Sequence, residues 1–124
     1  MKVRESAENY LESVLIIKNE KGNVRAIDIV NHLGFSKPSV SIALKQLETN
    51  GFITRDEDNH VHLTESGLEI ASSIYERHQL LSRFFTKIGV SESTAMDDAC
   101  KVEHHISQET FECLKDFYEK NLDS

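Results

Sequence analysis

"VRAIDIVNHLGFSKPSVSIALKQLETNGFI", residues 24–53, has the pattern of two short helices joined by a tight turn. Gly34 is expected to end the first helix, because glycine readily adopts the left-handed conformation that terminates helices. Ser36 is a favourable N-cap for the second helix, and Pro38 suits its first turn, where no backbone hydrogen bond is lost. Gly51 marks the end of this helix. The stretch therefore predicts a helix-turn-helix, whose second helix can enter the major groove of DNA.

The flanking sequence extends this unit in both directions. Residues 52–64, "FITRDEDNHVHLT", alternate as in a β-hairpin with a polar turn. Apolar periodicity predicts further helices over residues 6–20, 65–87, 92–106 and from 108 onward. We therefore expect a mainly α protein, with an N-terminal winged helix-turn-helix over residues 1–66 and a C-terminal helical dimerisation domain over residues 67–124. The apolar faces of the last three helices are larger than the helices can bury against one another, which predicts self-association.

The composition is that of an ordinary folded protein, with 124 residues, 39% of them hydrophobic and 28% charged. The longest aliphatic run, residues 14–17, is too short to cross a membrane, so no membrane partner is expected. No signal peptide precedes the first charged helix, which predicts a cytoplasmic protein whose two cysteines are thiols.

The net charge of −7 argues mildly against a nucleic-acid partner, but the charge is unevenly distributed. Residues 1–50 carry seven basic and six acidic side chains, whereas residues 51–124 carry seven basic and fifteen acidic ones. The first half therefore remains compatible with DNA, and the acidic second half would suit cations.

The helix predicted after residue 36 has a buried face formed by Val40, Leu44 and Leu47. Ile42 lies on the opposite face, where a thymine methyl group would give it an apolar partner. Serine hydroxyls can donate to bases, and lysines can neutralise phosphates. This reasoning nominates as DNA-contacting residues Arg25, Lys37, Ser39, Ser41, Ile42 and Lys45. Such helix pairs also occur in proteins that bind only protein, and single exposed isoleucines are common.

A second cluster lies in the stretch "DACKVEHHIS", residues 98–107. Cys100, Glu103 and His104 fall on one flank of the expected helix, whereas His105 points away. Thiolate, carboxylate and imidazole are all metal donors, and the mixed set suits divalent transition ions better than Mg²⁺ or Ca²⁺. His78 interrupts the apolar stripe of the long helix, where an imidazole needs a partner, and so supplements the three donors.

Each of these residues also has an ordinary structural explanation. A histidine in an apolar stripe is more often a hydrogen-bonded core residue, and Cys100 alone would be a small buried hydrophobe. Glu12, the remaining donor candidate, would alone be a solvated helix charge. The pattern C-x-x-E-H loosely resembles an inverted zinc-protease motif, but its first histidine is missing. No phosphate-binding loop or nucleophile elbow is present, so neither an enzyme nor a small-molecule substrate is expected.

Taken together, these motifs resemble the metal-dependent repressors of the diphtheria-toxin-repressor and manganese-transport-regulator family. The matching pieces include the quoted stretch, "ENYLESVL", "LTESGLEIA", "YERHQLL" and "DACKVEHHIS", in the family's order. The resemblance implies a cytoplasmic homodimer that binds a palindromic double-stranded DNA operator when metal is bound, and so represses metal-uptake genes. It implies metal ligands at Glu12, His78, Cys100, Glu103 and His104, and operator contacts at Ser36, Pro38 and Ser39.

The family's pattern is not reproduced at every position. Asn9 stands where manganese-type members usually have Asp and iron-type members have Met, so it enters the ligand set as an additional candidate. Glu12 follows the manganese type and Cys100 the iron type, which makes the site a hybrid. The expected cofactor is therefore Mn²⁺ or Fe²⁺, with Co²⁺ or Zn²⁺ able to substitute in vitro.

Two other readings of the sequence remain open at this stage. A winged-helix repressor could sense thiol oxidation through Cys100, whose neighbours Glu103 and His104 would tune its pKa. A metal buffer or structural zinc protein would bind metal without binding DNA.

Overall fold

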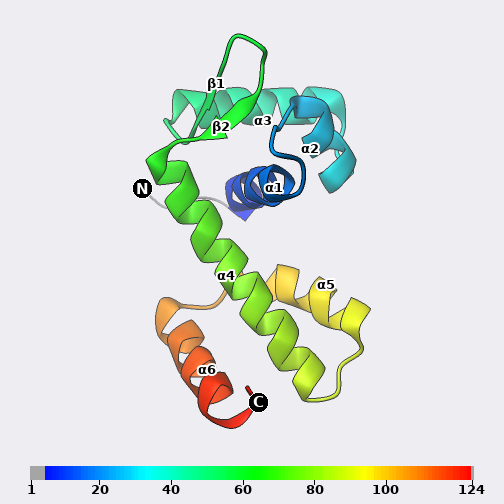
Figure 1. Ribbon diagram of the computed structural model, residues 1–124, viewed down its shortest axis with the longest axis vertical. Helices are drawn as coiled ribbons and strands as arrows, with labels where there is room; N and C mark the ends of the chain where they lie inside the picture. The colour runs from blue at the N-terminus through cyan, green and yellow to red at the C-terminus, as the bar shows by residue number, and fades with distance from the viewer. Residues whose placement is uncertain (1–4, 124) are drawn as a thin grey trace. The chain divides into compact units, whose positions relative to one another are not determined.

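The computed structural model describes residues 5–123 and forms two compact units, residues 1–73 and 74–124. Within the described residues the elements are, in chain order, α1 (Glu5–Lys21), α2 (Ala26–Leu33), α3 (Lys37–Thr49), β1 (Ile53–Arg55), β2 (Val61–Leu63), α4 (Glu65–Lys87), α5 (Glu92–Val102) and α6 (Gln108–Asn121) (Figure 1). The division between the units falls within α4. No helix of the described part is both long and apolar enough to span a bilayer.

The helix-turn-helix forms as its end signals predict. Gly34 closes α2 with φ 75°, in the left-handed region, and its N–H donates to the carbonyl of Val30. Ser36 caps α3, where its Oγ accepts a hydrogen bond of 3.2 Å from the backbone N–H of Ser39. Pro38 lies in the first turn of α3. These local signals place α3 directly after a short turn.

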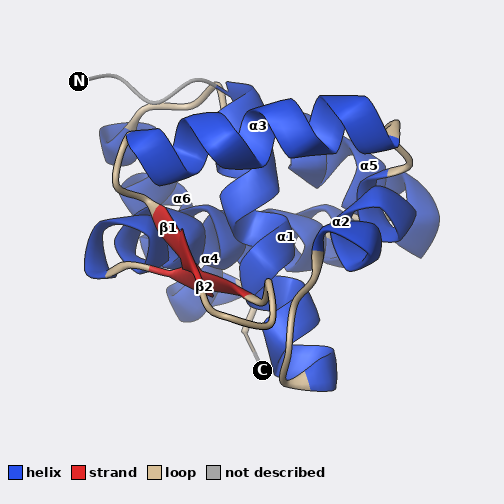
Figure 2. Ribbon diagram, turned by 90° about the horizontal axis from the view of Figure 1, so that it is seen from above, coloured by secondary structure: helices blue, strands red, loops and turns tan. Residues whose placement is uncertain are grey.

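The wing is a small antiparallel hairpin, in which β1 pairs with β2 (Figure 2). Ile53 opposes Leu63, and the carboxylate of Asp56 accepts backbone hydrogen bonds from Asp58 and His60 in the connecting turn. A hydrogen bond from the His62 ring holds the pKa of the Asp56 carboxyl well below its usual range. The turn therefore has its own polar framework, with Asp56 at its centre.

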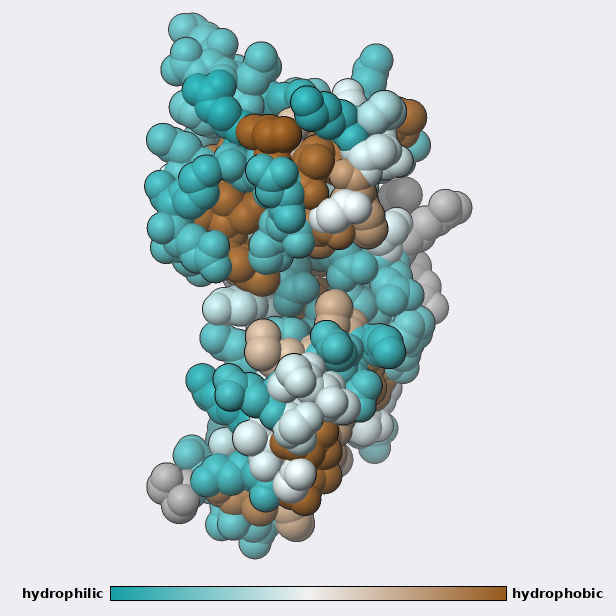
Figure 3. All heavy atoms as spheres, turned by 90° about the vertical axis from the view of Figure 1, so that its right-hand side faces the viewer, coloured by the Kyte–Doolittle hydropathy of each residue, from teal (hydrophilic) through white to brown (hydrophobic). Residues whose placement is uncertain are grey.

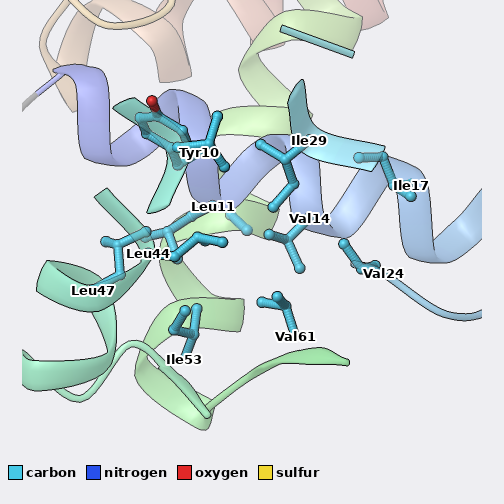
Figure 4. Packing of buried hydrophobic residues seen from close by; sticks show 12 residues of the cluster. Tyr10, Leu11, Val14, Ile17, Val24, Ile29, Leu44, Leu47, Ile53 and Val61 are labelled. Carbon is cyan, nitrogen blue, oxygen red and sulfur yellow. The ribbon is translucent and has the colours of Figure 1, made fainter. Parts of the chain in front are cut away.

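The first unit encloses one hydrophobic core, shown in close-up in Figure 4. Side chains from α1, α2, α3, both strands and the start of α4 meet there; the buried residues are Tyr10, Leu11, Val14, Ile17, Val24, Ile29, Val40, Leu44, Leu47, Ile53, Val61 and Ala71. At the hairpin's exit, a Cβ atom on Gly67 would lie only 2.0 Å from the carbonyl oxygen of Phe52, so this position requires glycine. The core fixes α3 and the wing against α1.

The second unit packs α6 against the C-terminal half of α4, where Leu80, Phe111 and Tyr118 are buried. One expectation about this unit is wrong. Helix α5 ends at Val102, not at Ile106, and Glu103 is its C-cap residue. The physical reason is that Arg77 on α4 donates hydrogen bonds to the backbone carbonyls of Glu103 and Ile106.

Candidate metal centre and DNA-binding face

His78 and Glu103 are brought together although 25 residues separate them. Nδ1 of His78 lies 2.9 Å from Oε2 of Glu103, and the Glu103 side chain is 0% exposed. Helix α4 supplies the histidine, and the end of α5 supplies the carboxylate. Burying a carboxylate is costly unless cations or hydrogen-bond donors compensate it. The imidazole of His78 provides such compensation for Glu103.

His104 adds a second imidazole to the same carboxylate. Its Nε2 lies 3.3 Å from Oε1 of Glu103, and its side chain is 0% exposed. His105, the next residue, is exposed, as predicted, although both histidines lie beyond the end of α5 at Val102. His78, Glu103 and His104 therefore form one cluster of two ring nitrogens and two carboxylate oxygens within the second unit. This donor chemistry fits a borderline divalent transition ion.

The other predicted ligands are found in different settings. Cys100 forms no disulfide and lies exposed on α5, one turn before Glu103. Glu12 and Asn9 lie on α1 of the first unit, where Glu12 is buried and Asn9 is half-buried. A glutamate within the buried part of an amphipathic helix is unusual, because glutamate is almost never fully buried without compensation. Their roles as metal ligands stay predictions.

Sequence reasoning overlooked Arg77, the neighbour of His78 on α4. Its guanidinium donates hydrogen bonds to the backbone carbonyls of Glu103 and Ile106 and to the side chain of Gln108. No periodicity or cap signal marks this residue, since its partners lie 26 to 31 positions further along the chain. The segment that carries Glu103 and His104 is thus attached to α4 by a residue outside the predicted site.

The predicted DNA-contacting face of α3 is exposed. Val40, Leu44 and Leu47 are buried, as expected, and Ile42 on the opposite face is 61% exposed. The remaining nominated residues, all exposed, are Arg25, Ser36, Lys37, Pro38, Ser39, Ser41 and Lys45. Ser36 and Ser39 also bond to each other, with 2.8 Å between their Oγ atoms, which orders the start of the helix. Contact with DNA at each of these residues stays a prediction.

Comparison with known proteins bears directly on the two units. Residues 2–61 match the N-terminal DNA binding domain of the iron dependent repressors, and residues 64–122 match the metal binding and dimerisation domain of the same repressors. The chain is 36% identical over 118 residues to the transcriptional regulator MntR of Escherichia coli O157:H7, an alignment covering 95% of this chain and 76% of the relative. The chain belongs to the iron-dependent repressor family.

Other similarities agree with membership in the iron-dependent repressor family. The HTH-type transcriptional regulator MJ0568 of Methanocaldococcus jannaschii is 33% identical over 121 residues, covering 96% of this chain and 97% of that protein. The manganese regulator SloR has the same fold, with a TM-score of 0.80 at 24% identity over 96% of this chain. IdeR of T. acidophilum gives a TM-score of 0.79 at 21% identity, again over 96% of this chain. The chain spans about half the length of these two solved structures, 55% in each case.

Family membership resolves the choice between classes of function. An iron-dependent repressor is a metal-dependent, DNA-binding transcriptional regulator and not an enzyme. The alternative of a thiol-redox sensor based on Cys100 is not supported, because the matched C-terminal domain is described as a metal-binding one. A metal buffer without DNA binding is also set aside, because the N-terminal half matches a DNA-binding domain.

Proposed function

We propose that this chain is a cytoplasmic repressor activated by Mn²⁺ or Fe²⁺ that controls metal-ion uptake and homeostasis genes. The observation that carries the proposal is the completely buried Glu103 carboxylate, approached by Nδ1 of His78 and by Nε2 of His104. A buried carboxylate between two imidazoles can bind a cation, because the lone pairs of these groups accept either a proton or a metal ion. The match to the iron dependent repressors and the similarity to SloR, which is named a manganese regulator, support the choice of metal.

The proposed ligand set has His78, Glu103 and His104 as its centre, with Cys100, Glu12 and Asn9 as further donors. Carboxylate and imidazole donors accept Mn²⁺ and Fe²⁺, while the soft thiolate of Cys100 favours Fe²⁺, Co²⁺ and Zn²⁺. Co²⁺ and Zn²⁺ are therefore expected to bind in vitro, since raw affinity follows the general order of divalent ions. A bound ion would supply positive charge and coordination bonds; the residues of the chain supply the shape of the site.

On the DNA side, we propose that residues 1–66 form the DNA-binding domain and residues 67–124 the metal-binding and dimerisation domain. The proposed partner is a palindromic double-stranded operator, because a two-fold symmetric dimer presents two recognition helices to two half-sites. Figure 3 shows hydrophobic atoms at the surface of one face of the molecule. Exposed large hydrophobic residues of the second unit support dimerisation; they are Ile88, Met96 and Phe117. A dimerisation domain is also what the family model describes over residues 64–122.

The proposed regulation is a thermodynamic coupling between the two domains. If metal raises the affinity for the operator, the operator must raise the affinity for metal by the same factor, typically equivalent to about 1–3 kcal/mol. Histidine, cysteine and carboxylate donors must be deprotonated to bind, so metal uptake should release protons and weaken at low pH.

The test uses duplex DNA selected from a randomised pool with the full-length protein and Mn²⁺. Fluorescence anisotropy then measures the affinity of the selected duplex in chelator, in Mn²⁺ and in Fe²⁺ under anaerobic conditions. The proposal predicts tighter binding with either ion, and predicts that Glu103→Ala loses this response while remaining a dimer by light scattering. Equal DNA affinity with and without every divalent ion would contradict the proposal.

A further inference from the structure

Arg77 spans the turn between α5 and α6 from its place on α4. Its Nη1 donates to the carbonyl oxygens of Glu103, at 3.1 Å, and of Ile106, at 2.8 Å. Its Nη2 donates to Oε1 of Gln108 at 2.9 Å. The three acceptors cover both ends of the turn, so one side chain connects the end of α5 and the start of α6 to α4.

The guanidinium group is well suited to this arrangement. Carbonyls at the end of a helix and in a turn lack helical partners, and leaving them unsatisfied away from water is costly. Arginine offers five N–H donors in a fixed planar fork, whereas lysine offers a single compact ammonium group. The guanidinium is also packed in place, since its Cζ lies 5.5 Å from the ring centroid of Phe111, which is 1% exposed.

The turn that Arg77 holds is the one that carries Glu103 and His104. On the proposed function described above, these residues meet His78, which follows Arg77 directly on α4. We propose that Arg77 is a positioning residue that fixes this turn so that Glu103 and His104 face His78, and that it thereby sets metal affinity without binding the ion. Residues that orient ligands typically change metal affinity about 10- to 100-fold when they are replaced.

An electrostatic role for Arg77 would have the opposite sign. A fixed positive charge near a cation site repels the incoming ion, so removing that charge alone would strengthen metal binding. Arg77→Lys keeps the charge and loses the fork, whereas Arg77→Met loses both. Positioning predicts that both variants bind metal more weakly, by about 10- to 100-fold.

The experiment measures Mn²⁺ affinity of the full-length protein by isothermal titration calorimetry, and the visible absorption spectrum of its Co²⁺ complex at saturation. A distorted donor arrangement changes the Co²⁺ spectrum, which a loss of stability alone would not do. Lys115→Met is the matched control, because Nζ of Lys115 lies 3.7 Å from Oε2 of Glu76 and links α6 to α4 away from the turn. This control is expected to leave both the affinity and the spectrum unchanged.

These measurements distinguish failure of the positioning role of Arg77 from failure of the proposed metal-dependent function on which that role rests. If the wild-type protein fails to bind Mn²⁺ and Co²⁺, the proposed function fails. If it binds them and Arg77→Lys matches it in affinity and spectrum, the positioning role alone is overturned. Tighter binding by Arg77→Met with unchanged Arg77→Lys would also overturn it, in favour of electrostatics. Should both variants fail to fold, Gln108→Ala removes the Nη2 acceptor, along with the hydrogen bond that Nε2 of Gln108 donates to Oε1 of Glu112 within α6. This variant is expected to weaken metal binding a few-fold, and unchanged affinity would contradict the inference.

Discussion

Nδ1 of His78 lies 2.9 Å from Oε2 of Glu103, whose side chain is 0% exposed. A metal ion that binds here must compete with protons for the lone pairs of these two atoms. Glu103→Gln preserves the shape of the side chain and removes its charge, so Mn²⁺ affinity should fall by at least about 100-fold. Calorimetric titration measures the effect, with Glu76→Gln as the control, because Glu76 lies on α4 with His78 and its side chain is 55% exposed. Wild-type affinity in Glu103→Gln would show that the metal binds elsewhere.

The adjacent histidines provide a second comparison. The side chain of His104 is 0% exposed and its Nε2 lies 3.3 Å from Oε1 of Glu103, whereas His105 is exposed. His104→Ala should therefore abolish high-affinity Co²⁺ binding and its visible spectrum, and His105→Ala should leave both intact. An equal loss in the two variants would mean that the helical-wheel assignment is wrong.

The two cysteines allow a test of metal selectivity. Both are exposed and form no disulfide, but only Cys100 lies one turn from Glu103. Because thiolate is a soft donor, Cys100→Ser should weaken Zn²⁺ and Co²⁺ binding more than Mn²⁺ binding, by about tenfold. Cys113→Ser should change none of the three affinities. If Cys100→Ser binds all three ions as the wild type does, Cys100 is not a ligand.

On the DNA side, Lys45 is predicted to neutralise a phosphate from the exposed face of α3. Lys45→Ala should weaken binding of the selected duplex and lower the slope of log affinity against log salt by about 1. Anisotropy titrations at several salt concentrations measure this slope. Lys101→Ala, an exposed lysine on α5, serves as the control. An unchanged slope in Lys45→Ala would remove Lys45 from the interface.

Asp28 in α2 gives a pH-dependent prediction for the fold. A hydrogen bond from Lys21, together with the backbone N–H of Arg25, holds the pKa of Asp28 below its ordinary value of 3.8. A lowered folded-state pKa contributes stability that is present above the ordinary value and is lost as the pH falls through the folded value. Asp28→Asn should therefore reduce the free energy of unfolding by about 1 kcal/mol at pH 7. Urea unfolding should show this difference constant down to about pH 4 and shrinking below it; a difference independent of pH down to pH 2 would contradict the assignment.

The parts of the fold that the sequence predicts are those governed by local signals. The bounds of α4 were expected at residues 65 and 87, and the structure has them there. Helix α4 begins after Thr64 because Oγ1 of Thr64 accepts a hydrogen bond from the backbone N–H of Gly67 and so caps the helix. Gly34 and Ser36 similarly define the turn before α3, since helix caps depend only on residues three or four positions away.

What escaped prediction depends on contacts between distant segments. Apolar periodicity continues through Ile106, yet α5 ends at Val102 because Arg77, 26 or more positions earlier in the chain, binds the carbonyls of the following turn. The sequence nominates His78 and Glu103 as donors to one metal, but only the structure shows that their side chains lie 2.9 Å apart. The metal itself depends on small differences in donor softness that spacing does not encode.

If the protein is a metal-activated repressor, metal and DNA must each strengthen the binding of the other. Mn²⁺ affinity is measured for the full-length protein by calorimetry, first alone and then saturated with the selected duplex. Reciprocal coupling predicts tighter Mn²⁺ binding in the presence of DNA, by the same factor by which Mn²⁺ strengthens DNA binding, about 5- to 150-fold. Equal Mn²⁺ affinity with and without the duplex would contradict it.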